Sequence, residues 1–163
     1  VVHEIPLVGG DVALIDCEDV HLTVGRTWHL HNSHGNQYAY TSAGNGTARH
    51  VLLHRLILNV PHGMEVDHIN GNGLDNRRCN LRLVTRQQNS QNRRGPNRNS
   101  RTGVRNVALF RNGRFHVRIQ VSRRYIHIGY FETLEEANLA ARAARRQYMT
   151  HAPENLEQQA EAV

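Results

Sequence analysis

The segment Val66-Asp67-His68-Ile69-Asn70-Gly71-Asn72 sets the interpretation of this chain, because an Asp-His pair is followed at set intervals by two asparagines. Counted from His68 through Asn80 to Asn89, the spacing is H-x11-N-x8-N. This spacing would bring a possible general base, an amide that fixes a loop and a possible metal ligand into one short unit of two strands and a helix. The segment therefore predicts a chemical site made mostly from neighbouring elements of the chain.

Local patterns around the segment predict the elements of that unit. Residues 64–68 and 81–84 have the apolar, β-prone character of short strands, and the loop 69–78 between them is rich in Asn, Gly and Asp. The T-x-x-Q pattern that starts at Thr85 is typical of a capping box, so a helix is expected to begin there. Asn89 would then lie just over one turn into this helix.

The first 50 residues predict a series of short strands separated by turns. Residues 12–15 are apolar, residues 37–41 alternate and are β-prone, and Gly-Gly, Asn-Ser and Gly-Asn pairs punctuate the region. Residues 51–58 form a short apolar segment for which a helix is favoured over a strand. The N-terminal half is therefore expected to consist of short strands that lead into the unit just described.

Two further patterns suggest metal or disulfide frameworks but do not meet their requirements. His29, His31 and His34 form H-x-H-x-x-H, yet no acid or cysteine lies nearby, so a surface strand and turn is the favoured interpretation. Cys17 and Cys79 are far apart and form no C-x-x-C pair, which argues against a disulfide framework and a zinc ribbon.

Charge is distributed unevenly along the chain. Between Asn76 and Phe131 there are fourteen Arg and no Asp or Glu, whereas eight acids and three Arg precede Asn76. A solvated surface usually mixes both signs, and a long acid-free basic stretch is typical of a protein that binds a polyanion. The distribution therefore favours a nucleic acid as the partner.

Length and hydropathy exclude other classes. The 163 residues can form one compact domain or two small ones. No apolar run approaches the roughly 18 residues that a membrane span needs, and no signal peptide is visible. A cytoplasmic location with no membrane contact is expected.

The residues of the opening segment fit the needs of phosphodiester hydrolysis. A water must lose a proton as it attacks phosphorus, and negative charge on the phosphoryl and leaving oxygens must be neutralised. His68 can take the proton, and Asp67 can offer a hard anionic oxygen to Mg²⁺ or Mn²⁺. Because adjacent strand residues point to opposite faces, both can serve one reaction only if the end of the strand twists or breaks.

Together with His54-Arg55-Leu56 upstream and Asn80-Leu81-Arg82 downstream, these residues resemble the HNH homing endonucleases of phages and introns. The resemblance covers roughly residues 5–93 and implies an α+β fold, with a ββα-metal nuclease domain preceded by short β-strands. One position departs from the common pattern, since many HNH enzymes have His where this chain has Asn89. The homing branch often carries Asn there, and an amide oxygen favours Mg²⁺ or Mn²⁺ over zinc or nickel.

The resemblance also implies a role for each residue of the site. His68 would be the general base, and Asn80 would hold the loop that orients it. Asp67 and Asn89 would bind one divalent cation, Mg²⁺ or Mn²⁺.

Four neighbouring residues have less certain roles. Arg55, Arg77 and Arg78 are candidates for phosphate contacts, with a solvated guanidinium as the ordinary alternative. For His54, a structural role in the core or at the surface and a contact near the phosphate both stay open.

Residues 90–102 are rich in Asn, Arg, Ser and Gly, and such a composition predicts a linker that buries little. It is either a tether or an arm that follows the DNA backbone or enters the minor groove. The arginines that would make these contacts are Arg93, Arg94, Arg98 and Arg101.

From Gly103 the pattern predicts a small three-stranded antiparallel sheet with one packing helix. Asn112-Gly113 between two strand-like runs is a strong signal for a tight turn, and residues 114–121 alternate strictly between polar and apolar side chains. A second capping box starts at Thr133 and predicts an Ala-rich helix to about Met149. The apolar stripe of this helix comprises Ala137, Ala140, Ala141, Ala144 and Tyr148, and the polar tail after His151 is expected to be frayed.

Gly103-Val104-Arg105, Gly129-Tyr130-Phe131 and Glu135-Glu136-Ala137 resemble the plant ethylene-response-factor (APETALA-type) DNA-binding domain, although the Trp residues of the plant versions are absent. The resemblance implies a sheet that lies in the major groove of DNA. Arg can bind a guanine edge and Gln an adenine edge, while a phosphate contact is the alternative for any single Arg. The residues expected to contact DNA are Arg105, Arg114, His116, Arg118, Gln120, Tyr125 and His127.

The sequence therefore predicts a site-directed DNA endonuclease of a phage or mobile element that acts on double-stranded DNA. Its expected parts are a nuclease domain (1–92), a linker (93–102), a DNA-binding domain (103–150) and a tail (151–163). The alternative is a sequence-specific DNA-binding regulator that carries an inactive HNH fold. The target site, nicking against double-strand cleavage, and monomer against homodimer stay open.

Overall fold

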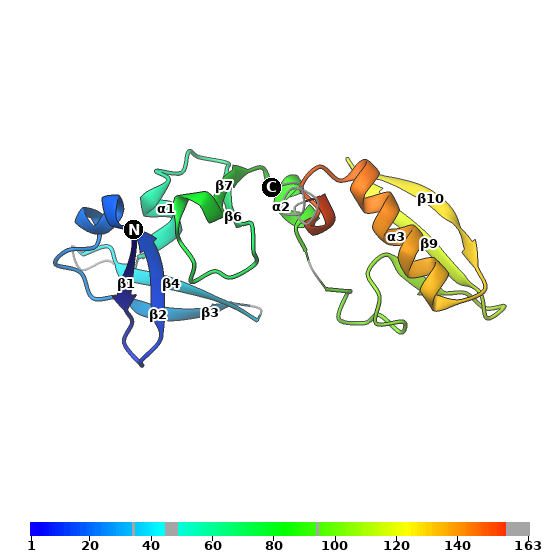
Figure 1. Ribbon diagram of the computed structural model, residues 1–163, viewed down its shortest axis with the longest axis horizontal. Coiled ribbons are helices and arrows are strands. Elements are labelled where there is room, and N and C mark those ends of the chain that lie inside the picture. Colours follow the sequence, from blue (N-terminus) through cyan, green and yellow to red (C-terminus); the bar gives the residue numbers. More distant parts are fainter. Residues whose placement is uncertain (34, 45–48, 94, 156–163) are drawn as a thin grey trace. The chain divides into compact units, whose positions relative to one another are not determined.

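The computed structural model describes residues 1–33, 35–44, 49–93 and 95–155. They divide into two compact units, Val1–Arg86 and Gln87–Val163. The first unit contains β1 (Val2–Pro6), β2 (Val12–Asp16), the 3-10 helix η1 (Cys17–Leu22), β3 (His29–Ser33), β4 (Asn36–Ser42), β5 (His50–Leu52), α1 (Leu53–Ile57), β6 (Glu65–His68), η2 (Arg78–Asn80) and β7 (Leu81–Val84). Helix α2 (Arg86–Gln91) follows, and β8 (Val107–Leu109), β9 (Phe115–Val121), β10 (Arg124–Phe131) and α3 (Leu134–Tyr148) belong to the second unit (Figure 1).

Three small antiparallel sheets make up the first unit. β1 pairs with β2, β4 lies between β3 and β5, and β6 pairs with β7. The short strands expected in the first 50 residues are therefore confirmed, as are the strand–loop–strand elements around His68. The helix expected over residues 51–58 is correct only in part, because β5 continues to Leu52 before α1 begins.

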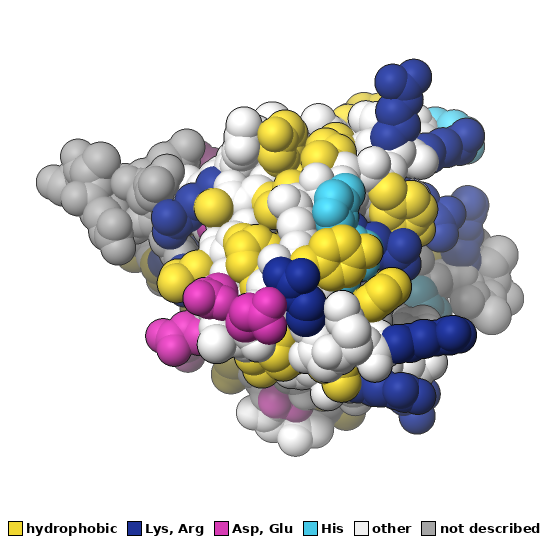
Figure 2. Space-filling view, turned by 90° about the vertical axis from the view of Figure 1, so that its right-hand side faces the viewer, with side chains coloured by type: hydrophobic (Ala, Val, Ile, Leu, Met, Phe, Trp, Pro, Cys, Tyr) yellow, Lys and Arg dark blue, Asp and Glu magenta, His cyan; other side chains and the backbone are white. Residues whose placement is uncertain are grey.

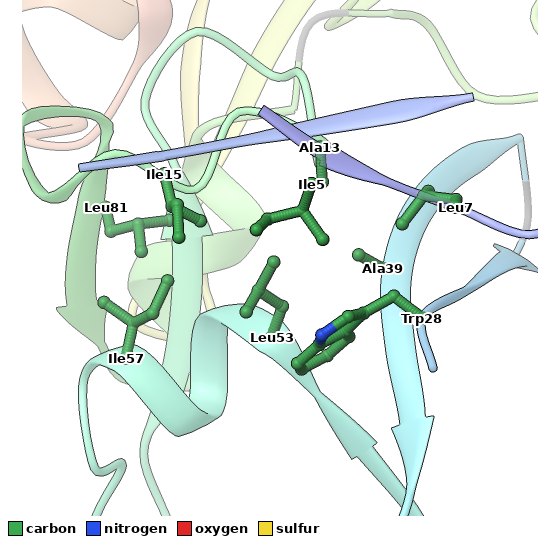
Figure 3. Packing of buried hydrophobic residues seen from close by; sticks show 9 residues of the cluster. All are labelled: Ile5, Leu7, Ala13, Ile15, Trp28, Ala39, Leu53, Ile57 and Leu81. Carbon is green, nitrogen blue, oxygen red and sulfur yellow. The ribbon is translucent and has the colours of Figure 1, made fainter. Parts of the chain in front are cut away.

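One apolar cluster joins these sheets. Figure 3 shows side chains from β1, β2, β4, α1 and β7 pointing toward one another, with Ile15 and Leu53 fully buried. Leu81 brings β7 into the same cluster. The N-terminal strands and the β6–β7 hairpin therefore form a single core. Each fully buried Leu or Ile in it contributes roughly 1.5–3 kcal/mol to the stability of the fold.

Gly73 brings the loop between β6 and β7 into close contact with β4. A Cβ at this position would lie 2.2 Å from the Gln37 carbonyl oxygen and 2.7 Å from the ring of Tyr38. Only glycine allows so close an approach of two backbones. The loop that follows His68 is therefore packed directly against the N-terminal sheet.

The second unit has the predicted three strands and one helix. β9 lies between β8 and β10, and α3 packs along one face of this sheet (Figure 1). Val117, Ile119 and Ala141 are fully buried between the two layers. The capping box at Thr133 is confirmed, since its side chain accepts a hydrogen bond from the Glu136 backbone N–H and the Glu136 side chain bonds back.

Two expectations for the C-terminal end are wrong. Tyr148, expected on the buried stripe of the helix, is 39% exposed. Ala152, expected in a frayed tail, is fully buried, and Glu154 is buried in an ion pair with Arg145. An unpaired charge could not be buried at this depth, so the pairing allows residues 151–155 to pack; residues 156–163 lie outside the described part of the chain. None of the helices that the described residues form has the length and apolar character needed to cross a bilayer.

Candidate active site and nucleic-acid surface

His68 lies at the end of β6 and is only 6% exposed. Its ring centroid is 5.1 Å from that of His54 on α1, at an interplanar angle of 87°, and 5.9 Å from that of Tyr38 on β4. The rings of Tyr38 and His54 are themselves 5.4 Å apart. Three elements that are distant in sequence therefore enclose the predicted general base in a cluster of rings.

Burial keeps both imidazoles of this cluster neutral at neutral pH. The pKa of His54 is lowered to about 3 by burial and by the nearby His68 and Arg55. Burial also lowers the pKa of His68, although a hydrogen bond with Asn76 and the charge of Asp67 act in the opposite direction. A neutral imidazole can accept a proton, which is the state that a general base requires.

Asn80 fixes the loop that follows His68. Its side-chain oxygen accepts a hydrogen bond from the Asn70 backbone N–H at 2.9 Å, and its side-chain amide donates to the Asp75 carbonyl at 2.7 Å. The Ile69 backbone N–H also donates to the Asn80 carbonyl at 2.9 Å. Both ends of the loop are thus tied to one buried side chain, and the catalytic role assigned to Asn80 stays a prediction.

Arg77 and Arg78 pair with carboxylates of the first unit while remaining partly exposed. Arg77 bonds both oxygens of Asp75 at 2.7 Å, and this pairing lowers the pKa of the Asp75 carboxyl. Arg78 bonds both oxygens of Asp19, at 2.9 and 2.6 Å. Carboxylates thus hold both guanidinium groups in a two-point geometry, and the expected phosphate contacts of these arginines stay a prediction.

Asp67 is 5% exposed and pairs with Arg82, whose Nη2 lies 2.6 Å from Oδ2. A carboxylate oxygen beside His68 has the donor chemistry that Mg²⁺ or Mn²⁺ prefers. Asn89, the second predicted ligand, lies on α2 and belongs to the second unit. A shared ion between Asp67 and Asn89 therefore stays a prediction.

A different acidic cluster also lies in the first unit. Among the described residues, the carboxylates of Asp16, Glu18 and Asp19 lie close enough together to hold an ion. Arg78 pairs with both Glu18 and Asp19, and its backbone N–H donates to Asp16. An arginine already offsets much of this charge, so we assign no metal to the cluster.

The second unit carries most of its predicted contact residues on the face of the sheet opposite α3. His116 Nε2 lies 2.8 Å from His127 Nδ1, and the Arg118 guanidinium lies 4.8 Å above the ring of Tyr125. Gln120 is exposed on the same strand as Arg118. Figure 2 shows Arg and His side chains close to exposed hydrophobic side chains, and a group of acidic side chains toward the left of the same view.

Two aromatic residues of this face are missing from the sequence-based set. Phe110 is 47% exposed and Tyr130 is 41% exposed. The Tyr130 ring stacks on His116 at 4.8 Å and lies 5.4 Å from Phe110. A register shift between His127 and Gly129 places Tyr130 opposite His116, whereas simple alternation from His127 would turn Tyr130 to the other face. A bulge of this kind has no clear signal in a single sequence.

Arg105 does not lie on the contact face. Its guanidinium donates to the Gln91 carbonyl at 3.2 Å and also to the Arg93 carbonyl, and burial lowers its pKa to about 10. Arg105 therefore holds the end of α2, and its expected DNA contact stays a prediction. The start of the expected linker is also packed against the protein, since Gln91 and Asn92 are only 7% and 8% exposed.

The remaining predicted arginines are at the surface. Arg93 bonds Asn97 Oδ1 at 2.6 Å and the Pro96 carbonyl at 2.8 Å, while Arg98 and Arg101 are exposed. Elsewhere, Arg55 is exposed, and its Nη1 lies 3.4 Å from the Met64 carbonyl oxygen. Arg114 is partly exposed and pairs with Glu132 at 2.9 Å. Arg94 lies outside the described residues.

Residues 51–91 match the model of the HNH endonuclease domain family. The matched range includes His54, Asp67, His68, Asn80 and Asn89. Such a domain indicates nuclease activity, implies binding of DNA and generally uses a divalent metal. No curated protein and no solved structure matches the chain. The N-terminal strands and the sheet of the second unit lie outside the match.

Proposed function

We propose that the protein is a metal-dependent DNA endonuclease in which His68 removes a proton from the attacking water. The observation that carries this proposal is the position of His68. It is a buried imidazole, kept in its base form by burial, at the end of a strand and directly after Asp67 in the chain. General-base catalysis by a positioned histidine contributes typically about 10²–10⁴-fold to a rate.

The other residues of the site would position the reactants. Asn80 holds the loop after His68 through its two side-chain hydrogen bonds, and Arg82 orients the carboxylate of Asp67. Asp67 and Asn89 would hold one Mg²⁺ or Mn²⁺, which when bound neutralises charge on the phosphoryl and leaving oxygens. The predicted ββα-metal arrangement of β6, β7 and α2 belongs to this proposal.

The second unit would bind double-stranded DNA and select the site. Arg118 and Gln120 are exposed on β9 and have the donors and acceptors that read guanine and adenine edges. The exposed arginines Arg98 and Arg101 would follow the phosphate backbone. The likeness to the ethylene-response-factor domain and the homing role in a phage or mobile element rest on sequence resemblance alone.

Incubation with supercoiled plasmid tests the proposal. With Mg²⁺ or Mn²⁺ the wild-type protein should relax or linearise the plasmid, which also separates nicking from double-strand cleavage. EDTA and Asp67→Ala should each abolish cleavage while a gel-shift assay shows unchanged DNA binding. Full cleavage in EDTA would contradict the metal mechanism, and specific binding without cleavage under any divalent ion would favour a regulator with an inactive HNH fold.

A further inference from the structure

One face of the β3–β4–β5 sheet carries a row of rings. His29 pairs with Tyr40 and His31 pairs with Tyr38 in the antiparallel register, so these four side chains share one face. The alternate residues of β4, Ala39 and Thr41, are buried on the other face. The ring-bearing side is therefore the outer side of this sheet at the exposed His31 and His50, whereas at Tyr38 the loop between β6 and β7 packs against it.

These rings contact one another across the strands. His50 stacks on Tyr40 at 4.3 Å, and His29 and His31 lie 5.4 and 6.0 Å from Tyr40. Farther along β4, Tyr38 contacts both His54 and His68. The ring contacts therefore form two groups on this face, one around Tyr40 that includes the exposed His50 and one around Tyr38 that includes the candidate general base, and the two tyrosines lie two residues apart on β4.

The segment that forms this face contains no negative charge. Between Asp19 and Glu65 there is no Asp or Glu, but there are three Arg and seven of the 12 His of the chain. Imidazole, phenol and guanidinium groups all donate hydrogen bonds to phosphate oxygens, and no carboxylate of this segment would repel them. Among the described residues, no group of three or more His, Cys, Asp or Glu side chains that could hold an ion includes a histidine, so we assign no metal to this face; His34 lies outside the described residues.

We propose that His29, His31, Tyr38, Tyr40 and His50, here called the ring face, form the surface along which the phosphate backbone of duplex DNA approaches His68. Two observations support this occupant: through Tyr38 the face reaches the ring of His68 in the candidate active site, and its segment lacks acids. The inference rests on the proposed nuclease function, because it names the residues that hold the substrate beside the cutting site.

The test uses the full chain with both exposed histidines of the ring face replaced, His31→Ala/His50→Ala. Binding to a labelled duplex is measured in EDTA, and KM and kcat are measured with a divalent metal. We expect Kd and KM to rise about tenfold, with kcat changing less than threefold, because the substrate is held less well while the catalytic residues are intact. The loss should be equal on two unrelated duplexes, since phosphate contacts carry no sequence information.

The matched control is His3→Ala/His21→Ala, which removes two exposed histidines of the same unit that lie on β1 and η1. It should leave Kd within twofold of the wild-type value. A second variant, His50→Glu, places a negative charge on the ring face and should raise Kd more than the double alanine variant does. Fluorescence of Trp28, the single tryptophan, shows whether each variant remains folded.

Each possible result of these measurements supports or overturns the ring face as a surface that binds the DNA backbone. An unchanged Kd for the double variant and for His50→Glu overturns the ring face and leaves the nuclease proposal standing. A loss confined to one duplex overturns the assignment to the phosphate backbone. If the wild-type protein cleaves nothing, the nuclease proposal fails, but the comparison of Kd values still decides whether the ring face binds DNA.

Discussion

The candidate active site of the first unit and the exposed face of the sheet in the second unit place their polar residues in opposite ways. In the first unit, the side chains of His54, Asp67 and His68 are each only 5–6% exposed. The two histidines contact each other and Tyr38, and Asp67 pairs with Arg82. In the second unit, Tyr125 and Tyr130 are 62% and 41% exposed on the face that carries Arg118 and His127. Burial changes the pKa of a side chain and fixes its orientation, which suits chemistry, whereas exposure leaves its hydrogen-bonding groups accessible to a partner.

Arginines illustrate the same contrast. Arg77, Arg78 and Arg82 of the first unit each pair with a carboxylate that lies earlier in the chain. On the sheet of the second unit, Arg118 stacks on an aromatic ring and remains exposed. A count of arginines along the sequence therefore overstates the charge that is accessible to DNA, because the fold brings distant acids to some of them.

The largest expected effect comes from the centre of the first unit. His68→Ala should reduce the rate of DNA cleavage by about two orders of magnitude or more, because it removes the general base. DNA binding should change by only a few-fold, since the exposed face of the second unit is untouched. Single-turnover cleavage and gel-shift assays measure the two quantities, and near wild-type cleavage would remove His68 from the mechanism.

Gly73→Ala tests whether the loop after His68 depends on its close approach to β4. The added Cβ would meet the Gln37 backbone, so the free energy of unfolding of the first unit should fall by about 1–3 kcal/mol. Trp28 is 3% exposed in this unit, and its fluorescence reports the transition. Gly95→Ala is the control, because nothing lies within 4 Å of a Cβ there; equal stability of the two variants would contradict the packing argument.

Two arginines of the second unit allow a structural role to be separated from a DNA-reading role. Arg105 donates to backbone carbonyls, whereas Arg118 is exposed on the sheet. Arg105→Gln should reduce stability by about 1–3 kcal/mol, because carbonyls near Gln91 lose a charged donor. Arg118→Gln should leave stability unchanged but weaken discrimination at one or two base pairs by about 1–3 kcal/mol if it reads a guanine. Circular dichroism measures the stability of each variant, and competition binding measures its discrimination between DNA sites. A stability loss in Arg118→Gln together with a loss of discrimination in Arg105→Gln would contradict the roles given to the two arginines.

The last prediction concerns how the stability of the first unit responds to acid. The pKa of His54 falls from 6.5 to about 3 in the folded protein, so below pH 6.5 the unfolded chain binds a proton that the fold excludes. Stability should therefore decrease as the pH falls from 6.5 toward 3, with this group contributing a slope of up to roughly 1.4 kcal/mol per pH unit.

His54→Phe isolates that contribution, because the variant keeps a ring at the position but cannot bind the proton. The free energy of unfolding, followed by Trp28 fluorescence in urea, should decrease less steeply with acid in the variant than in the wild-type protein. Parallel curves between pH 6.5 and 4.5 would mean that His54 is not held neutral by burial.

Much of the local structure could be predicted, whereas the surroundings of the site could not. The strand Leu81–Val84 and the cap at Thr133 follow from short-range patterns. The proximity of Tyr38 and His54 to His68 could not be predicted, because it depends on how the β3–β4–β5 sheet and α1 pack against the β6–β7 hairpin.

The sequence by itself determined the spacing of Asp67, His68, Asn80 and Asn89 and the alternation along β9, since caps, turns and periodicity act over a few residues. Only the tertiary structure decided which polar groups are buried and which partners they have. The pairing of Arg78 with Asp19 joins residues 59 positions apart, and the bulge before Gly129 turns Tyr130 to the face of His116. Such outcomes depend on the packing of whole sheets and on strand register, and no short window of sequence specifies these.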